Sequence, residues 1–390
     1  MKKRILRYVK HIILTFIILG ILAISFGLYH GASFRYAENP EMMNWDNDGP
    51  YIFYNNDSIF TVNYIRGNQE DGFYIDQKDY DLDSKIPAYC YFSLDSTRFE
   101  FTINNTIEIP ENTYNDNTKI LAISDIESSF KTFRDFLIAN KVINEKLNWA
   151  FGNGHLVLLG DFVDRDFSAT QVLWFVYKLE QDAKKQGGTV HYILGNHELK
   201  NMQGNFENTS QKYYHVSSIL KRKQTDLYGT NSFLGKWMSS KNSIEKINGI
   251  LFAHGGIHPD LARYKTNLDE VNQIVRSNYY NPYYPNPQKN LEQLLISSHK
   301  GIAWYRGYFK DDLSQEDVEK GLSIFDAKSI VVGHTLQSKI NRQYKGKVIG
   351  IDVKHPKDYS KSLPEKKSEG LLIENNQYFR VLHNGIKKEI

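Results

Sequence analysis

The feature that most constrains this chain is a series of five short apolar runs, each followed at once by polar side chains. The runs are four or five residues long and rich in Ile, Leu and Val, which is typical of buried strands. They lie at 120–123, 156–159, 190–194, 250–253 and 329–332. Helical spacing of apolar residues separates the first three, as at Phe130, Phe133 and Leu137. Strands that alternate with helices indicate an α/β architecture.

The polar residues after these runs are of the types that bind metals. They are Ser124-Asp125-Ile126-Glu127, Gly160-Asp161-Phe162-Val163-Asp164-Arg165, Gly195-Asn196-His197-Glu198, His254-Gly255-Gly256 and Gly333-His334-Thr335. A single Asp or His after a strand is usually a helix cap or a turn residue. Ligands in α/β folds gather beyond the carboxyl ends of strands, so five such ends in order predict one shared metal site.

These motifs resemble those of the calcineurin-like metallophosphatases, and most closely those of the phosphoprotein (serine/threonine) phosphatase family. That family carries GDxHG, GDxVDRG, GNHE and HGGxxPxL, and the similarity extends over about 118–375. The resemblance implies an α/β (α+β) fold, a two-sheet β-sandwich flanked by helices, here preceded by a small β-rich segment. It also implies a metal-dependent phosphatase, that is, a phosphoric ester hydrolase.

The resemblance implies two divalent metal ions, most often Mn, with Fe, Zn or Mg as alternatives. Asp161 would bridge the two ions and Asp125 would hold the first. Asn196, His254 and His334 would hold the second. A hydroxide between the metals would attack phosphorus in line, so that phosphate monoesters of proteins or small molecules are hydrolysed.

The resemblance also implies the residues that move a proton and bind phosphate. His197 would be the general acid, oriented by Asp164, because an imidazole held by a carboxylate can donate a proton near neutral pH. Arg165 would bind phosphate oxygens through its planar guanidinium, together with Asn196 and Arg306. Arg306 matches the family pattern less closely, and a surface or stacking role is the alternative.

The first metal position departs from the family pattern. Glu127 stands where the family has histidine, and a carboxylate there would still bind a hard ion such as Mn, Mg or Fe. Ser128 and Asp166 replace two glycines of the motifs. His355 follows a further predicted strand at 347–351 and is a second candidate ligand, with a turn histidine before Pro356 as the alternative.

The N-terminus predicts a membrane anchor. Five cations lie within the first ten residues, and residues 12–28 form an uncharged apolar run that spans about 25 Å as a helix. We expect an uncleaved anchor at 1–30 with the cations in the cytoplasm and the rest of the chain periplasmic or extracellular. A cleaved signal peptide is the alternative, although the residues before a possible cut fit it poorly.

The remaining organisation follows from composition and turns. We expect a linker at 31–48, a small β-rich domain at 49–115 and a metallophosphatase domain at 118–390 with insertions at 204–248 and 260–325. The formal net charge is +3, but it is −2 without the N-terminal cations, which argues against nucleic-acid binding. A single cysteine, Cys90, excludes a disulfide framework.

Two other functions stay open at this point. The chain could hydrolyse dinucleotide polyphosphates or phosphodiesters on the same fold, because a fold does not fix a substrate. It could also be an inactive binding or scaffold protein of the cell envelope. The presence of Asp161, Asn196, His197, His254 and His334 together argues against an inactive site.

Overall fold

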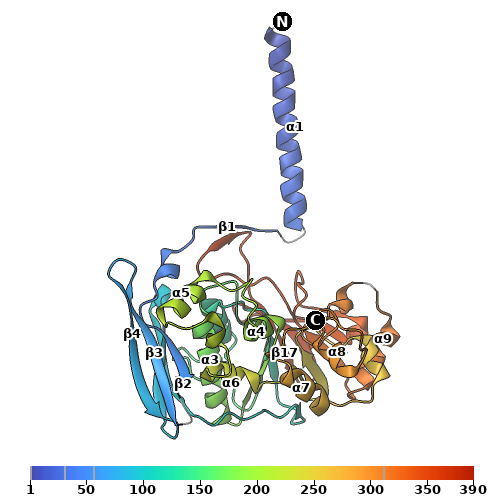
Figure 1. Cartoon of the computed structure of the whole chain (residues 1–390). Coiled ribbons are helices and arrows are strands. Elements are labelled where there is room, and N and C mark those ends of the chain that lie inside the picture. The colour runs from blue at the N-terminus through green and yellow to red at the C-terminus, as the bar shows by residue number, and fades with distance from the viewer. Residues whose placement is uncertain (1, 30–31, 56–57, 311) are drawn as a thin grey trace.

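The centre of the protein is a sandwich of two six-stranded sheets (Figure 1). The computed structural model describes residues 2–29, 32–55, 58–310 and 312–390. The first sheet has the order β10-β9-β8-β17-β18-β19 and the second the order β14-β15-β13-β12-β11-β7. The strands of the first sheet are β8 (Ile120–Ile123), β9 (His155–Leu159), β10 (Thr189–Ile193), β17 (Glu369–Glu374), β18 (Gln377–Leu382) and β19 (Lys387–Glu389). Those of the second are β7 (Thr113–Tyr114), β11 (Ile244–Ile247), β12 (Ile250–Ala253), β13 (Ser329–Val332), β14 (Asn341–Gln343) and β15 (Val348–Gly350).

Alternate residues of each strand pack on opposite faces of its sheet. Ile120 and Ala122 of β8 join one apolar cluster with Phe252 of β12 and Val331 of β13, which fills the seam between the sheets. Their neighbours Leu121 and Ile123 belong instead to the larger cluster that includes the helices. Because both faces are buried, these strands are apolar throughout. The predicted sandwich and its helical flanks are confirmed.

The helices pack outside the sandwich. The helical spacing at 130–137 and 172–179 falls within α2 (Phe130–Ala139) and α3 (Ala169–Lys184), and α3 packs against β10. The others are α4 (Asn196–Met202), α5 (Gln211–Ile219), α6 (Phe233–Ser239), α7 (Leu268–Ser277), α8 (Leu291–Ile296) and α9 (Gln315–Ser323). The predicted insertion at 204–248 contains α5 and α6 and ends in β11, so its last residues form part of the second sheet.

The β-rich segment that precedes the sandwich is present, and it shares the core of the sandwich. It contains the sheet β2 (Asp48–Tyr54), β3 (Ile59–Asn68) and β4 (Gly72–Asp81), and the hairpin β5 (Ile86–Phe92) and β6 (Thr97–Ile103). Trp174 of α3 donates a hydrogen bond to Pro50 O at 2.8 Å and stacks on Phe101. Asp48 forms a buried ion pair of 2.8 Å with Lys212 of α5. One continuous apolar cluster therefore runs through both parts.

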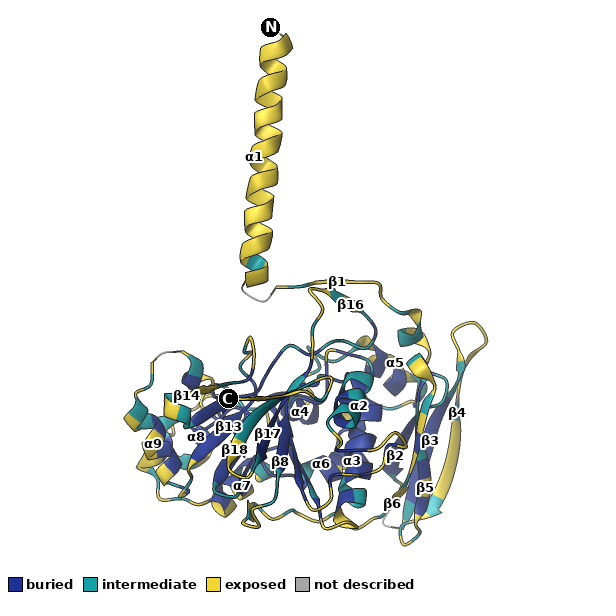
Figure 2. Cartoon of the chain, turned by 180° about the vertical axis from the view of Figure 1, so that it is seen from behind, coloured by how far each residue is buried: buried dark blue, intermediate teal, exposed yellow. Residues whose placement is uncertain are grey.

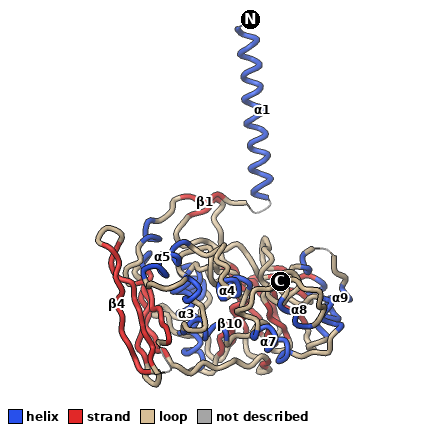
Figure 3. The backbone as a smooth tube through the Cα atoms, viewed as in Figure 1, coloured by secondary structure: helices blue, strands red, loops and turns tan. Residues whose placement is uncertain are grey.

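The helix α1 (Lys2–Tyr29) projects from the body with none of its residues buried (Figure 2). By length and composition it is able to cross a membrane, and a signal sequence passes the same test. After it, β1 (Phe34–Tyr36) pairs antiparallel with β16 (Lys361–Leu363), beside the body (Figure 3). The predicted boundary between anchor and linker, at 30–31, lies outside the described residues.

Candidate active site

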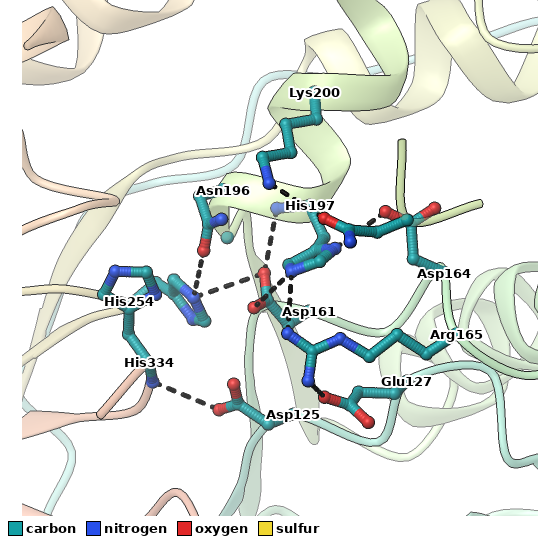
Figure 4. A network of polar contacts seen from close by, with 12 residues as sticks. Asp125, Glu127, Asp161, Asp164, Arg165, Asn196, His197, Lys200, His254 and His334 are labelled. Carbon is teal, nitrogen blue, oxygen red and sulfur yellow. Dashed lines mark hydrogen bonds and ion pairs between the residues drawn. The ribbon is translucent and has the colours of Figure 1, made fainter. Parts of the chain in front are cut away.

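Side chains from both sheets meet at the carboxyl ends of the strands (Figure 4). Asp161 follows β9, Asn196 follows β10, His254 follows β12 and His334 follows β13. His254 Nε2 lies 3.2 Å from Asp161 Oδ1 and 3.1 Å from Asn196 Oδ1. One ligand atom each of Asp161, His254 and His334 lie within 4.8 Å of one another, and all three residues are buried. Asp125, after β8, accepts the backbone N–H of His334 at 3.2 Å.

The hydrogen bonds around His254 test whether a metal fits here. Its Nδ1 donates to Leu159 O at 2.7 Å, which leaves the Nε2 lone pair directed at Asp161 Oδ1 and Asn196 Oδ1. Three buried acceptor atoms that face one another need a cation. Burial lowers the pKa of His254, but the Asp161 carboxylate outweighs it and raises that pKa to about 10. The donor set therefore fits a metal ion.

His334 shows the same arrangement. Its Nε2 donates to Trp304 O at 3.1 Å, so Nδ1 is the nitrogen that carries the lone pair, and Arg306 Nη2 lies 3.3 Å from it. Burial, and after it the neighbouring His254, lower the pKa of His334 to about 2. The ring is therefore neutral, which is the state that binds a metal.

A third buried carboxylate, which the sequence-based prediction did not include, stands next to Asp125. Asp352 follows β15, the strand beside β13. Burial and then Asp352 hold the pKa of Asp125 well above its ordinary value. Burial and then Glu127 raise the pKa of Asp352 to about 7. Buried carboxylates that raise one another's pKa are stabilised by divalent cations.

An imidazole–carboxylate pair lies beside these groups. His197 Nδ1 donates to Asp164 Oδ2 at 2.7 Å, and His197 Nε2 lies 3.8 Å from Asp161 Oδ2. Burial lowers the pKa of His197, but Asp161 and Asp164 together raise it above its ordinary value. Asp164 Oδ1 accepts from Asn201 at 2.7 Å and from Thr209 at 2.8 Å. Asn201 and Thr209 were not predicted, although Asn201 lies four residues after His197 on α4.

Comparison with known proteins decides the family. The family model for calcineurin-like phosphoesterases matches residues 118–338. The chain belongs to the calcineurin-like phosphoesterase family. The predicted family, the fold class and the prediction of a metal-dependent phosphatase are thereby confirmed.

Individual phosphatases also resemble the chain, and one solved structure does so well beyond that domain. A cold-active protein-tyrosine phosphatase from a psychrophilic Shewanella species is 31% identical, with a TM-score of 0.77 over 88% of this chain and 98% of that one. Shewanella-like protein phosphatase 1 of Plasmodium berghei is 29% identical over 57% of this chain and 62% of its own length. Shewanella-like protein phosphatase 2 of Arabidopsis thaliana is 23% identical over 66% of this chain and 76% of its own length.

In this phosphoesterase the residue that departs from the family pattern is paired with two cations. Glu127 Oε1 accepts from Arg165 Nη1, and Oε2 accepts from Lys357 Nζ at 2.7 Å. Burial raises the pKa of Glu127, but Lys357 and Arg165 outweigh it and lower that pKa. Arg165 also lies 3.3 Å from His197 Nε2 through Nη2. The guanidinium predicted to bind phosphate is thus held between Glu127 and the imidazole, and a metal-binding role for Glu127 stays a prediction.

The two remaining predicted residues lie at the edges of the site. Arg306 donates through Nη1 to His334 O, and its Nη2 lies 3.3 Å from His334 Nδ1. Arg306 also lines a cavity of about 420 Å³. His355 is buried, and its Nε2 donates to Ser124 O at 3.0 Å, next to Asp125. Its Nδ1 has no hydrogen-bond partner among the described residues. Metal binding by His355 likewise stays a prediction.

The backbone of the phosphoesterase loops is held by Glu198, whose role was not predicted. Its carboxylate accepts the N–H groups of Asp161 at 2.9 Å, Phe162 at 2.7 Å and Gly195 at 2.8 Å, and the Tyr192 hydroxyl at 3.0 Å. Gly195 has no space for a side chain, because a Cβ there would meet Asp161 Oδ1 at 2.4 Å. Glu198 thus joins the turn that carries Asn196 to the loop that carries Asp161.

Several loop residues also have left-handed backbone, with φ of 54° at Asp125, 58° at Asp161, 69° at Asp164 and 62° at His334. Such conformations cost non-glycine residues of the order of 1–3 kcal/mol each and persist where the surrounding structure imposes them. The residues that converge on the site are therefore among the strained positions of the described chain, which also include Leu147 and Asp326.

Proposed function

We propose that the protein is a phosphomonoesterase that uses two divalent metal ions and acts on phosphorylated protein side chains. The observation that carries the proposal is the buried group of acceptors around His254 Nε2, with the His197–Asp164 pair beside it. Metal ligands and a general acid lie side by side, as hydrolysis of a phosphate ester requires.

In this proposal Asp161, Asn196, His254 and His334 hold one metal ion, and Asp125 and Asp161 hold the other. When bound, the ions would polarise the phosphoryl group and supply the attacking oxygen at neutral pH. Mn is the first candidate, with Fe, Zn or Mg as alternatives, because the donors are oxygen and nitrogen. Asp352 is placed to complete the position next to Asp125, whichever of Glu127 and His355 contributes.

The chain's own residues perform the remaining steps. His197 Nε2 donates a proton to the leaving oxygen, while Asp164 holds Nδ1 and keeps the ring in the donating orientation. Asn201 and Thr209 in turn hold Asp164. Arg165 is the first phosphate-binding group, with Arg306 and Asn196 on the other side, because a guanidinium binds two phosphate oxygens at once.

Two cavities beside the site support a protein substrate. One, of about 420 Å³, is lined by Arg306, Lys300 and Lys310, and the other, of about 540 Å³, by aromatic side chains that include Tyr283. Trp304 lines both. A cationic hollow and an aromatic hollow that adjoin suit a phosphorylated side chain with its flanking residues. The names of the relatives, protein phosphatases and a protein-tyrosine phosphatase, agree with this class of substrate.

Hydrolysis assays on the full chain in detergent, with Mn added, test the proposal. We expect release of phosphate from phosphotyrosine or phosphoserine peptides and from a mono-aryl phosphate, and none from a bis-aryl phosphate. Asp161→Asn and His197→Asn should abolish phosphate release. The control His383→Asn changes an exposed histidine near the end of the sequence that is not part of the site, and it should leave phosphate release unchanged. Preference for a bis-aryl phosphate or a dinucleotide tetraphosphate would support the alternative hydrolase, and no turnover of any ester would support the inactive protein.

We further propose that α1 remains as a membrane anchor, with the catalytic domain periplasmic or extracellular. The five cations that precede the apolar run support this orientation, because positive residues stay on the cytoplasmic side. The mass of the purified protein tests it: loss of residues up to about 32 would show a cleaved signal peptide. Protease added to intact cells or spheroplasts should digest the catalytic domain, and protection would reverse the proposed orientation.

A further inference from the structure

The ribbon formed by β1 and β16 carries an apolar face that nothing in the described part of the protein covers. Phe34 lies opposite Leu363, and Tyr36 opposite Lys361. Directly opposed residues of an antiparallel pair point to the same side, as do residues two apart on one strand. The four side chains therefore share one face. Phe34 is 60% exposed, Tyr36 51% and Leu363 64%, which is unusual for large apolar groups.

The other face of the ribbon is polar. It carries Arg35 and Ser362, which are paired across the strands. Ser362 is half-buried, and its hydroxyl donates to Pro364 O at 3.0 Å. Arg35 is exposed, as is the rest of β1. The large apolar side chains of the ribbon are thus gathered on one exposed face.

The segment between α1 and β1 is short, which limits the distance between the apolar face and the end of α1. Four residues separate Tyr29, the last residue of α1, from Phe34, so the chain takes five residue-to-residue steps between them. At about 3.5 Å for each extended residue, they reach at most about 18 Å. The headgroup layer on each side of the hydrocarbon core is itself about 5–8 Å thick. A ribbon tethered so closely to a membrane-spanning helix stays beside the bilayer surface, as its place between α1 and the body indicates (Figures 1 and 2).

We propose that the face formed by Phe34, Tyr36, Lys361 and Leu363 contacts the bilayer interface. The proposal rests on the anchoring role proposed above for α1. Aromatic side chains favour the boundary between headgroups and acyl chains, and a lysine at its edge places its ammonium among lipid phosphates. The ribbon therefore forms a second attachment, beside the single helix.

This attachment fixes which side of the catalytic domain faces the membrane. Lys357, which pairs with Glu127, stands four residues before Lys361 of β16. Asn39, three residues after β1, donates its backbone N–H to Tyr359 O at 2.8 Å. The ribbon is thus joined by short segments to the side of the site that holds Arg165. With the site held in this way, the enzyme favours phosphorylated side chains that lie close to the membrane surface.

Lipid-quenching measurements on the full chain in nanodiscs test the contact. A dye attached at Leu363→Cys should be quenched by nitroxide lipids labelled near the headgroup. Tyr74→Cys on β4, where Tyr74 is 63% exposed, is the matched control and should not be quenched. Cys90 is fully buried, so reagents label the introduced cysteine. Equal quenching at the two positions would overturn the proposal. So would a dye at Leu363→Cys that is not quenched by lipid and is protected only when two copies share a disc, because the face would then contact a second copy of the chain.

Activity measurements separate this proposal from the proposed function. The double variant Phe34→Ser, Leu363→Ser should hydrolyse a soluble aryl phosphate in detergent at the parent rate, because neither residue lies in the site. In nanodiscs it should lose the parent's preference for a lipid-tethered phosphopeptide over the same peptide in solution. An unchanged preference would refute the membrane contact alone. Absence of aryl phosphate hydrolysis in the parent chain would refute the proposed function.

Discussion

The substitution Glu198→Gln should destabilise the loops that position the metal ligands. Glu198 is fully buried and accepts four hydrogen bonds, two at each carboxylate oxygen. A glutamine of the same shape presents an NH₂ group in place of one oxygen. If the NH₂ group replaces Oε2, it faces the N–H groups of Asp161 and Gly195, and both lose their acceptor. If it replaces Oε1, the Tyr192 hydroxyl can turn to accept, and only Phe162 N–H is left unpaired.

The second orientation is therefore favoured, and it sets the magnitude. One charge-assisted bond is lost, a buried N–H is left unpaired, and the other bonds weaken because the acceptor is neutral. At about 1–3 kcal/mol for each of the first two effects, the free energy of unfolding should fall by about 2–6 kcal/mol. For a chain of 390 residues, with about 2.1 cal/mol/K of unfolding entropy per residue, that corresponds to a fall in melting temperature of roughly 2–7 °C. Because the Asp161 loop loses its support, metal affinity should also fall about 10–100-fold.

Thermal unfolding in detergent, followed by circular dichroism, measures the first effect, and calorimetric titration with Mn measures the second. Tyr192→Phe is the matched control: it removes one neutral donor from the same carboxylate and should cost about 1 kcal/mol. If Glu198→Gln were no less stable than Tyr192→Phe, the carboxylate would not be holding the loops together, and the reasoning would fail.

Three further outcomes are expected. Asp164→Asn removes a carboxylate that helps to raise the pKa of His197. The alkaline limb of the pH–rate profile, where the general acid loses its proton, should therefore move to lower pH. A limb that stays in place would exclude His197 as the general acid oriented by Asp164. Glu127→Gln should change the KM for an aryl phosphate, because it releases Arg165. Elemental analysis of the same variant tests the predicted metal-binding role: loss of one metal ion would confirm it, and an unchanged metal content would exclude it. Removal of metal by a chelator should lower the melting temperature as well as the rate, because buried carboxylates lose their cation, and Mn should restore both.

The sequence predicted the convergence of the site because strand ends are local signals. Asp161, Asn196, His254 and His334 each follow a short apolar run, and the carboxyl ends of neighbouring parallel strands meet at one edge. No knowledge of distant contacts was needed for these residues. The same local signal marks Asp352, which follows the strand predicted at 347–351, as well as His355, three residues later.

The surroundings of the site could not be predicted in this way. The role of Glu127 depends on Lys357, which lies 230 residues further along the chain. No local sequence pattern predicts a pair between residues so far apart. Glu198 and Asn201 act through backbone groups and carboxylates whose directions are set by the fold. The C-terminal strands β17 to β19 form half of the first sheet, next to β8. Their place in that sheet was not predicted, because it depends on pairing between segments far apart in the sequence.

The continuous core that joins strands β2–β6 to the sandwich bears on how such a protein can be divided. Trp174 and Lys212 belong to the catalytic part, yet their partners Pro50 and Asp48 belong to the segment before it. Removal of that segment would expose an apolar surface and leave a buried lysine without its counter-charge. The segment cannot be exchanged as an independent cassette between phosphatases, and a minimal enzyme would have to begin no later than Asp48.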